Sequence, residues 1–238
     1  MDIKSWNKDI KQLREIILKR DNIEESIKLC LELHSMVHSS NMSGIDKKTF
    51  EDELWEGLDE NTFRTSTNEK GRTIAYGIWH SSRIEDITMN ILVAGSEQVF
   101  NVEDWKEKIN SKIIDTGNAM TGEDIMEFSK HINIEELKNY RVAVGRRTIE
   151  IIKNLKPADM KRKIEKDRLN RVLEEGAVLD VEGANWLIDF WGRKNAAGII
   201  LMPATRHHVV HINESLSAKR KIDQEKSKSL DMRNVMFI

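Results

Sequence analysis

Three observations predict an all-α fold. Apolar residues recur every three or four positions along most of the chain, which is the spacing of one helix face. The chain has only two prolines and few aromatic residues, and it is rich in Glu, Lys, Ile and Leu. No segment alternates apolar and polar residues in the way that indicates a sheet of any size. Together they favour a four-helix bundle with accessory helices.

The predicted helices follow the apolar periodicity, with polar or glycine residues between them. Asp21 or Asn22 is the candidate N-cap of the second helix, and Thr121 is the candidate N-cap of a later one. Gly95 and Pro157 each close a long helix. The predicted helical ranges are 3–20, 23–40, 50–58, 73–94, 105–114, a short helix from 121, 134–155, 161–175, a helix around 186–191, and 204–221. The four principal helices are 23–40, 73–94, 134–155 and 204–221.

The chain divides into three parts on this reading. Residues 1–22 form an N-terminal accessory helix, and residues 23–222 form the metal-binding helical bundle. Residues 223–238 are a charged C-terminal tail that we expect to fray, although its apolar end, 235–238, could dock on the bundle. No internal repeat is evident.

Charge and composition narrow the possible partners. The net charge is −2 and no long basic block is present, so we expect no nucleic-acid binding. No apolar run approaches the ~20 residues that a membrane-spanning helix needs. The N-terminus lacks the apolar core of a signal peptide, and the single cysteine, Cys30, excludes a disulfide framework within the chain. We therefore expect a cytoplasmic protein that acts on a small molecule.

The segment 204–214 contains three of the seven histidines and is the strongest candidate for a functional site. His207 and His211 are four residues apart, so on a helix they lie one above the other. Glu214 follows on the same face, where its carboxylate could accept the N–H of a ligand imidazole. His80, on a separate apolar helix, is the candidate third ligand. Three imidazoles with one open position are typical of catalytic zinc sites.

The other histidines leave more than one interpretation open. His34 and His38 are also four apart, on the helix predicted at 23–40. One of them could line the metal cavity as a proton carrier or hydrogen-bond donor, or both could be partly exposed and contact only water. We expect His208 to point away from the metal site, because adjacent helical residues project about 100° apart. We expect His131 to be exposed or to cap a helix.

Two arginines flank the predicted ligands. Arg83 and Arg206 could each bind an anionic group of a substrate, because guanidinium pairs well with carboxylate or phosphate. The alternative, which we favour, is a buried salt bridge to a nearby acidic residue. The acidic candidates are Glu85, Asp86 and Glu214.

These histidines carry a resemblance to a known family. The dipeptide Trp79-His80, followed much later by His207-x-x-x-His211, resembles the DinB-like superfamily of helical bundles, over roughly residues 23–221. The usual family ending His-x-Gly-Gln is here His211-Ile212-Asn213-Glu214, so the small residue and the glutamine are replaced. The resemblance implies a four-helix bundle, often dimeric, that binds zinc, nickel or iron through His80, His207 and His211. The resemblance also implies an enzyme that acts in the place of a glutathione transferase, because characterised members of the family use a low-molecular-weight thiol in S-transfer or isomerisation.

Three functions follow as alternatives. The first is a metal-dependent transferase in which the open coordination position takes a substrate thiol. The second is a hydrolase that uses metal-bound water, with Glu214 or a nearby histidine as general base. The third is a non-catalytic bundle with a structural metal or a small ligand. A fourth protein ligand, for example His34 or His38, would favour this third function, because closed coordination leaves no place for a substrate.

Overall fold

The computed structural model describes residues 2–66, 68 and 70–235. Its helices are α1 (Ile3–Ile16), α2 (Ile23–Met36), α3 (Ser40–Ser43), α4 (Phe50–Trp55), α5 (Glu60–Arg64), α6 (Ile74–Asp86), α7 (Val99–Val102), α8 (Trp105–Ile109), α9 (Gly122–His131), α10 (Ile134–Asn154), α11 (Pro157–Lys161), α12 (Lys166–Glu174), α13 (Glu182–Gly192), α14 (Ala196–Leu201) and α15 (His207–Val235). A 3-10 turn, η1 (Arg20–Asn22), precedes α2. Two π-helical segments, η2 (Ile87–Ala94) and η3 (Met202–Arg206), follow α6 and precede α15. Within these residues the only β-type pairing is an isolated bridge between Lys163 and Asn195, so the predicted all-α class is confirmed.

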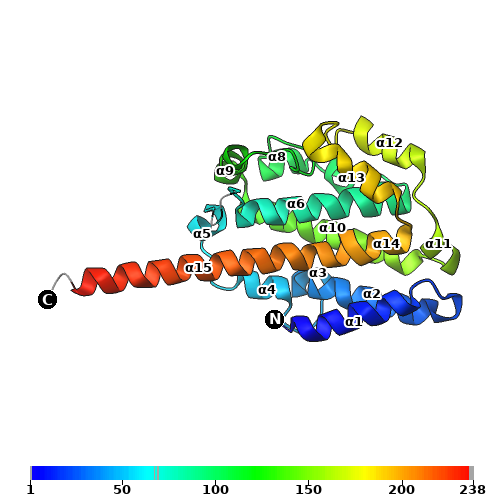
Figure 1. The fold of residues 1–238 in the computed structure, drawn as a ribbon, viewed down its shortest axis with the longest axis horizontal. Coiled ribbons are helices and arrows are strands. Elements are labelled where there is room, and N and C mark those ends of the chain that lie inside the picture. The colour runs from blue at the N-terminus through cyan, green and yellow to red at the C-terminus, as the bar shows by residue number, and fades with distance from the viewer. Residues whose placement is uncertain (1, 67, 69, 236–238) are drawn as a thin grey trace.

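Four long helices, α2, α6, α10 and α15, form the body of the molecule. Helix α6 packs against both α10 and α15, and α10 also contacts α2. Figure 1 shows these helices running along the longest axis, with α1 beside α2 at one edge and α12 and α13 at the opposite edge. All 13 residues of α6 are buried, which marks it as the central helix.

The ends of α6 follow from its sequence. The Thr73 hydroxyl accepts the N–H of Tyr76 and so caps the first turn. At the other end the chain passes into η2, and Gly95, with φ of 70°, ends the helical path in the left-handed conformation that glycine tolerates best. Further along the chain, Thr121 caps α9 through a capping box with Asp124, as predicted.

An aromatic cluster fixes α6 in the core. Trp79, which is fully buried, lies 5.6 Å from Phe100 and 5.4 Å from Phe128, measured between ring centroids. Its indole N–H donates to the carbonyl oxygen of Asp115, so the ring is buried without losing a hydrogen bond. These contacts fix the position of the residue that follows, His80.

The structure differs from the sequence prediction at the C-terminus. We expected the chain beyond Asp223 to fray, but α15 continues to Val235. Lys226 Nζ lies 2.6 Å from an oxygen of Asp59, so this stretch is tied to the start of α5, and its Lys and Glu residues favour helix. The predicted docking segment 235–238 lies mostly outside the described residues. No helix in the described part of the chain is both long and apolar enough to cross a membrane.

Candidate metal centre

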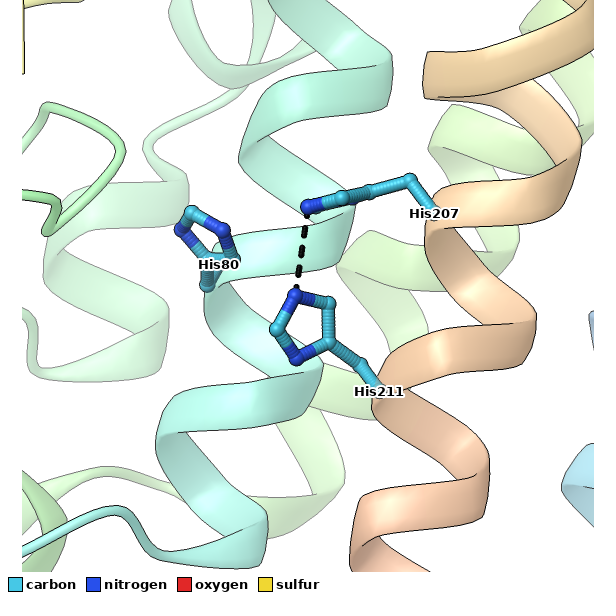
Figure 2. A group of neighbouring side chains, drawn as sticks. All are labelled: His80, His207 and His211. Atoms are coloured by element: carbon cyan, nitrogen blue, oxygen red, sulfur yellow. Dashed lines mark hydrogen bonds between the residues drawn. The ribbon is translucent and has the colours of Figure 1, made fainter. Parts of the chain in front are cut away.

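The three predicted metal ligands lie together where α15 crosses α6. His207 and His211 project from successive turns of α15 toward His80 on α6 (Figure 2). Their ring centroids are 4.5 Å apart, and each lies about 5 Å from the ring of His80, at 5.0 Å and 4.9 Å. One ligand atom from each residue lies within 4.8 Å of the other two, so the group could hold a metal ion.

Neighbouring oxygens favour one tautomer of two of these rings. His80 Nδ1 lies 2.7 Å from the carbonyl oxygen of Thr116, which can only accept, so the proton is on Nδ1 and Nε2 keeps its lone pair. His211 Nδ1 lies 3.2 Å from Glu214 Oε2, and the carboxylate favours the same tautomer. His211 Nε2 is in turn 3.1 Å from His207 Nε2, which in this tautomer donates its proton to it. A cation held by all three rings would take the place of that proton.

Burial keeps two of these imidazoles neutral. Burial lowers the pKa of His80 to about 3, with a further contribution from the neighbouring His211. Burial, together with the other histidines, also holds the pKa of His207 well below its usual value. A neutral imidazole is the form that binds metals, so at neutral pH His80 and His207 can bind without first losing a proton.

One side of the triad borders solvent. His207 is partly exposed, and Glu214 is half exposed beside it. Arg72 lies next to Glu214, with Nη1 3.8 Å from Oε2, and its guanidinium stands 6.0 Å from the ring centroid of Tyr76. Tyr76 itself stacks on His80, with centroids 5.4 Å apart. Glu214, Arg72 and Tyr76 therefore form a charged and aromatic rim at the solvent-facing side of the triad. Of these three residues, only Glu214 was predicted from the sequence.

Glu214 acts on the triad through His211. The hydrogen bond from His211 lowers the pKa of the Glu214 carboxyl, and burial opposes this effect. The carboxylate is thus ionised and oriented toward the ligand imidazole. This is the contact expected from the sequence, where Glu214 follows His211 by three residues.

His34 and His38 do not join the triad. Both are fully buried and contact Glu85 of α6. His34 lies on α2, whereas His38 lies just after α2 ends at Met36 and not on the helix as predicted. His208, which points away from the triad as expected, also reaches Glu85. Of the two alternatives for His34 and His38, exposure to water is wrong, and the cluster that they form was not foreseen.

The structure decides between the alternatives for Arg83. Its guanidinium is buried and donates to Asp86, at 2.9 Å, and to Tyr140, at 2.8 Å. It also donates to a side-chain oxygen of Gln98 and to the carbonyl oxygen of Ile114. The anion contact that we considered is therefore wrong, because all of these donors are directed into the core.

Arg206 remains on the surface. It is exposed at the end of η3, directly before His207. The buried salt bridge that we favoured for Arg206 is therefore wrong. Among the described residues no salt bridge joins it to Glu85, Asp86 or Glu214, and Arg72 lies beside Glu214 instead. Its possible role as an anion contact stays a prediction.

Comparison with known proteins does not extend the resemblance. No protein-family model matches the chain, and no curated protein matches it either. What is established is an all-α fold whose interior carries histidine and glutamate groups that could hold a metal ion.

Proposed function

We propose that the protein is a divalent-metal-dependent enzyme of the DinB-like type, with His80, His207 and His211 as the metal ligands. One observation carries the proposal: three imidazoles converge from two packed helices, and the Nδ1 atoms of His80 and His211 face oxygens that lie away from the common centre. Zinc, nickel and iron all accept such ligands, and the three nitrogens alone do not choose among them.

Three protein ligands leave a position for a substrate. Within the described residues, the group around His80 contains no fourth histidine, cysteine or carboxylate ligand. His34 and His38, the candidates for closing the coordination, are held by Glu85 instead. This favours an enzyme over a bundle with a purely structural metal at this site.

We further propose S-transfer as the reaction, with a low-molecular-weight thiol as one substrate. A bound divalent ion would lower the pKa of a substrate thiol and so supply a thiolate nucleophile. The protein then needs no nucleophile of its own, which agrees with the state of Cys30, whose pKa burial raises to about 12. Arg72, at the solvent-facing rim, is placed to attract an anionic group of the thiol compound.

Hydrolysis is the second candidate, and Glu214 is the residue on which it depends. A hydrolase would use this carboxylate to take a proton from water. In the structure the carboxylate instead accepts the N–H of His211 and faces Arg72, which is the arrangement of a residue that positions a ligand. S-transfer is therefore the leading proposal.

Metal content tests the first step. Protein purified without a histidine tag is analysed for zinc, nickel and iron, and compared with the double variant His207→Ala/His211→Ala. The control is His131→Ala, since the His131 side chain is half exposed on α9 and its Nε2 contacts the exposed carboxylate of Glu127. We expect the double variant to lose one equivalent of metal and the control to lose none. Equal metal content in all three proteins would contradict the site.

A conjugation assay tests the reaction. Metal-loaded protein is incubated with cysteine-containing cofactor thiols and a panel of electrophiles, and thioether products are identified by mass spectrometry. We expect conjugation with wild type and none with the double variant. Absence of conjugation with every thiol would refute S-transfer while leaving the metal site intact, and hydrolysis of ester substrates would then be measured.

A further inference from the structure

A second group of convergent ligands lies deeper in the bundle than the triad. His34 Nε2 is 2.6 Å from Glu85 Oε1, and His38 Nε2 is 2.9 Å from Glu85 Oε2. His208 Nε2 approaches the same Oε2 to 2.8 Å. We call these four residues the Glu85 cluster. His34 comes from α2, His38 from the bend just after it, Glu85 from α6 and His208 from α15, and all four are fully buried.

The hydrogen bonds of the Glu85 cluster are incomplete. His34 and His38 can each donate one N–H to the carboxylate, which leaves the Nδ1 atoms of both rings buried without a partner. Neither nitrogen of His208 has a hydrogen-bond partner, because its short approach to Glu85 lies outside the directions of a hydrogen bond. A buried nitrogen without a hydrogen-bond partner needs a physical reason, and an ion shared with the nearby carboxylate is one that fits the short His208–Glu85 distance.

Among the described residues, the ion-pair partners of Glu85 are the three histidines, and no Arg or Lys pairs with it. The nearby buried cation, Arg141, lies 2.7 Å from Glu51 and directs its other donors at Ser81, Ser82 and the carbonyl oxygen of Val37. It is therefore already paired with a carboxylate other than Glu85.

We propose that His34, His38, Glu85 and His208 form a second site for a divalent transition-metal ion, separate from the triad. Three imidazoles and one carboxylate are ligands that zinc and iron share, and four protein ligands make a closed site of the structural kind. Ligand atoms of His34, His38 and Glu85 already lie within 4.8 Å of one another. A dication here balances the buried carboxylate and joins α2 to α6 and α15.

The two sites differ in access to solvent, and this difference makes them separable in solution. The triad has a partly exposed member, His207, whereas every side chain of the Glu85 cluster is covered. A chelator should therefore remove one equivalent of metal quickly and a second one slowly, because the buried ion is released only when the bundle opens locally.

The experiment measures stoichiometry and release in the whole chain. Metal-stripped wild-type protein is refolded with excess Zn²⁺ or Co²⁺, desalted, and analysed for metal per chain. The bound metal is then withdrawn by EDTA while release is followed over time. We expect two equivalents in wild type and two phases of release. Either one equivalent that leaves in the fast phase, or two that leave in a single fast phase, would overturn the proposal without the need for any variant.

Variants then assign each equivalent to its site. Glu85→Gln and His208→Gln should each retain one equivalent and lose the slow phase, and His207→Ala/His211→Ala should retain one equivalent and lose the fast phase. His131→Gln is the control and should retain both. Circular dichroism confirms that each variant is folded.

The outcomes separate this inference from the proposed function. If the slow phase survives in a folded Glu85→Gln or His208→Gln variant, the second site is refuted, and the triad is unaffected. If the fast phase survives in His207→Ala/His211→Ala, the triad is refuted instead. Should Glu85→Gln fail to fold, His208→Gln and the wild-type stoichiometry still decide.

Discussion

Glu214 offers a direct test of how the protein prepares its metal ligands. Its Oε2 atom lies 3.2 Å from His211 Nδ1, so it favours the tautomer with the proton on Nδ1, the one in which Nε2 can bind a cation. Loss of such a partner typically weakens metal binding about 10–100-fold. Because the Glu214 side chain is 50% exposed, water can replace part of the contact, and we expect the lower end of that range for Glu214→Ala. A tenfold loss corresponds to about 1.4 kcal/mol of binding free energy.

The glutamine variant divides this effect into two parts. The amide oxygen of Glu214→Gln can still accept the N–H of His211 but carries no charge, so its metal affinity should fall between those of wild type and Glu214→Ala. Glu127→Ala is the matched control, since Glu127 makes a comparable contact, 3.1 Å from His131 Nε2, on the exposed side of α9.

The assay is competition for Zn²⁺ or Co²⁺ with a chromophoric chelator at neutral pH. Each protein is first checked by circular dichroism for unchanged helix content. If Glu214→Ala binds metal as tightly as wild type, the Glu214 carboxylate does not select the tautomer of His211 for metal binding.

Three further predictions concern stability, and urea denaturation of metal-free protein measures each. The folded state keeps His38 and His208 neutral, with pKa values of about 3, whereas the unfolded chain protonates them near pH 6.5. The free energy of unfolding should therefore be constant above pH 6.5. As the pH drops from there toward 3, it should fall by up to about 1.4 kcal/mol per pH unit for each of the two histidines. Arg83→Met should cost about 3–5 kcal/mol, because it leaves a buried carboxylate unpaired; unchanged stability would contradict this. A Cβ on Gly145 would lie 3.0 Å from the His38 ring, so Gly145→Ala should destabilise by about 1–3 kcal/mol. Gly183→Ala, where the nearest atom is 3.5 Å away, should not.

The sequence was sufficient for the helices and for the triad's residues. Helical periodicity depends on local spacing, which is visible in one dimension, and His207 and His211 share a face for the same reason. His80 could be paired with them because it stands alone in an apolar helix, the kind of segment that faces a bundle interior.

The Glu85 cluster could not be predicted in the same way. Glu85 stands beside Arg83 and Asp86, so in sequence it was a candidate salt-bridge partner of Arg83 and not of a histidine. Only the burial of α6 on all sides turns these charges inward. The π-helical segment η3 could not be predicted from the sequence either, since Pro203 is compatible with the first turn of an ordinary α-helix. These features depend on contacts between distant parts of the chain.

The adjacency of His207 and His208 sets the rotational phase of α15. The two side chains project about 100° apart and engage different groups, His80 on one side and Glu85 on the other. If α15 turned about its axis, one imidazole would move toward its group while the other moved away. His80 and Glu85 on α6 therefore together fix the rotation of α15 about its own axis. Any repacking of this interface must preserve the angle between the His207 and His208 side chains as well as their distance from α6.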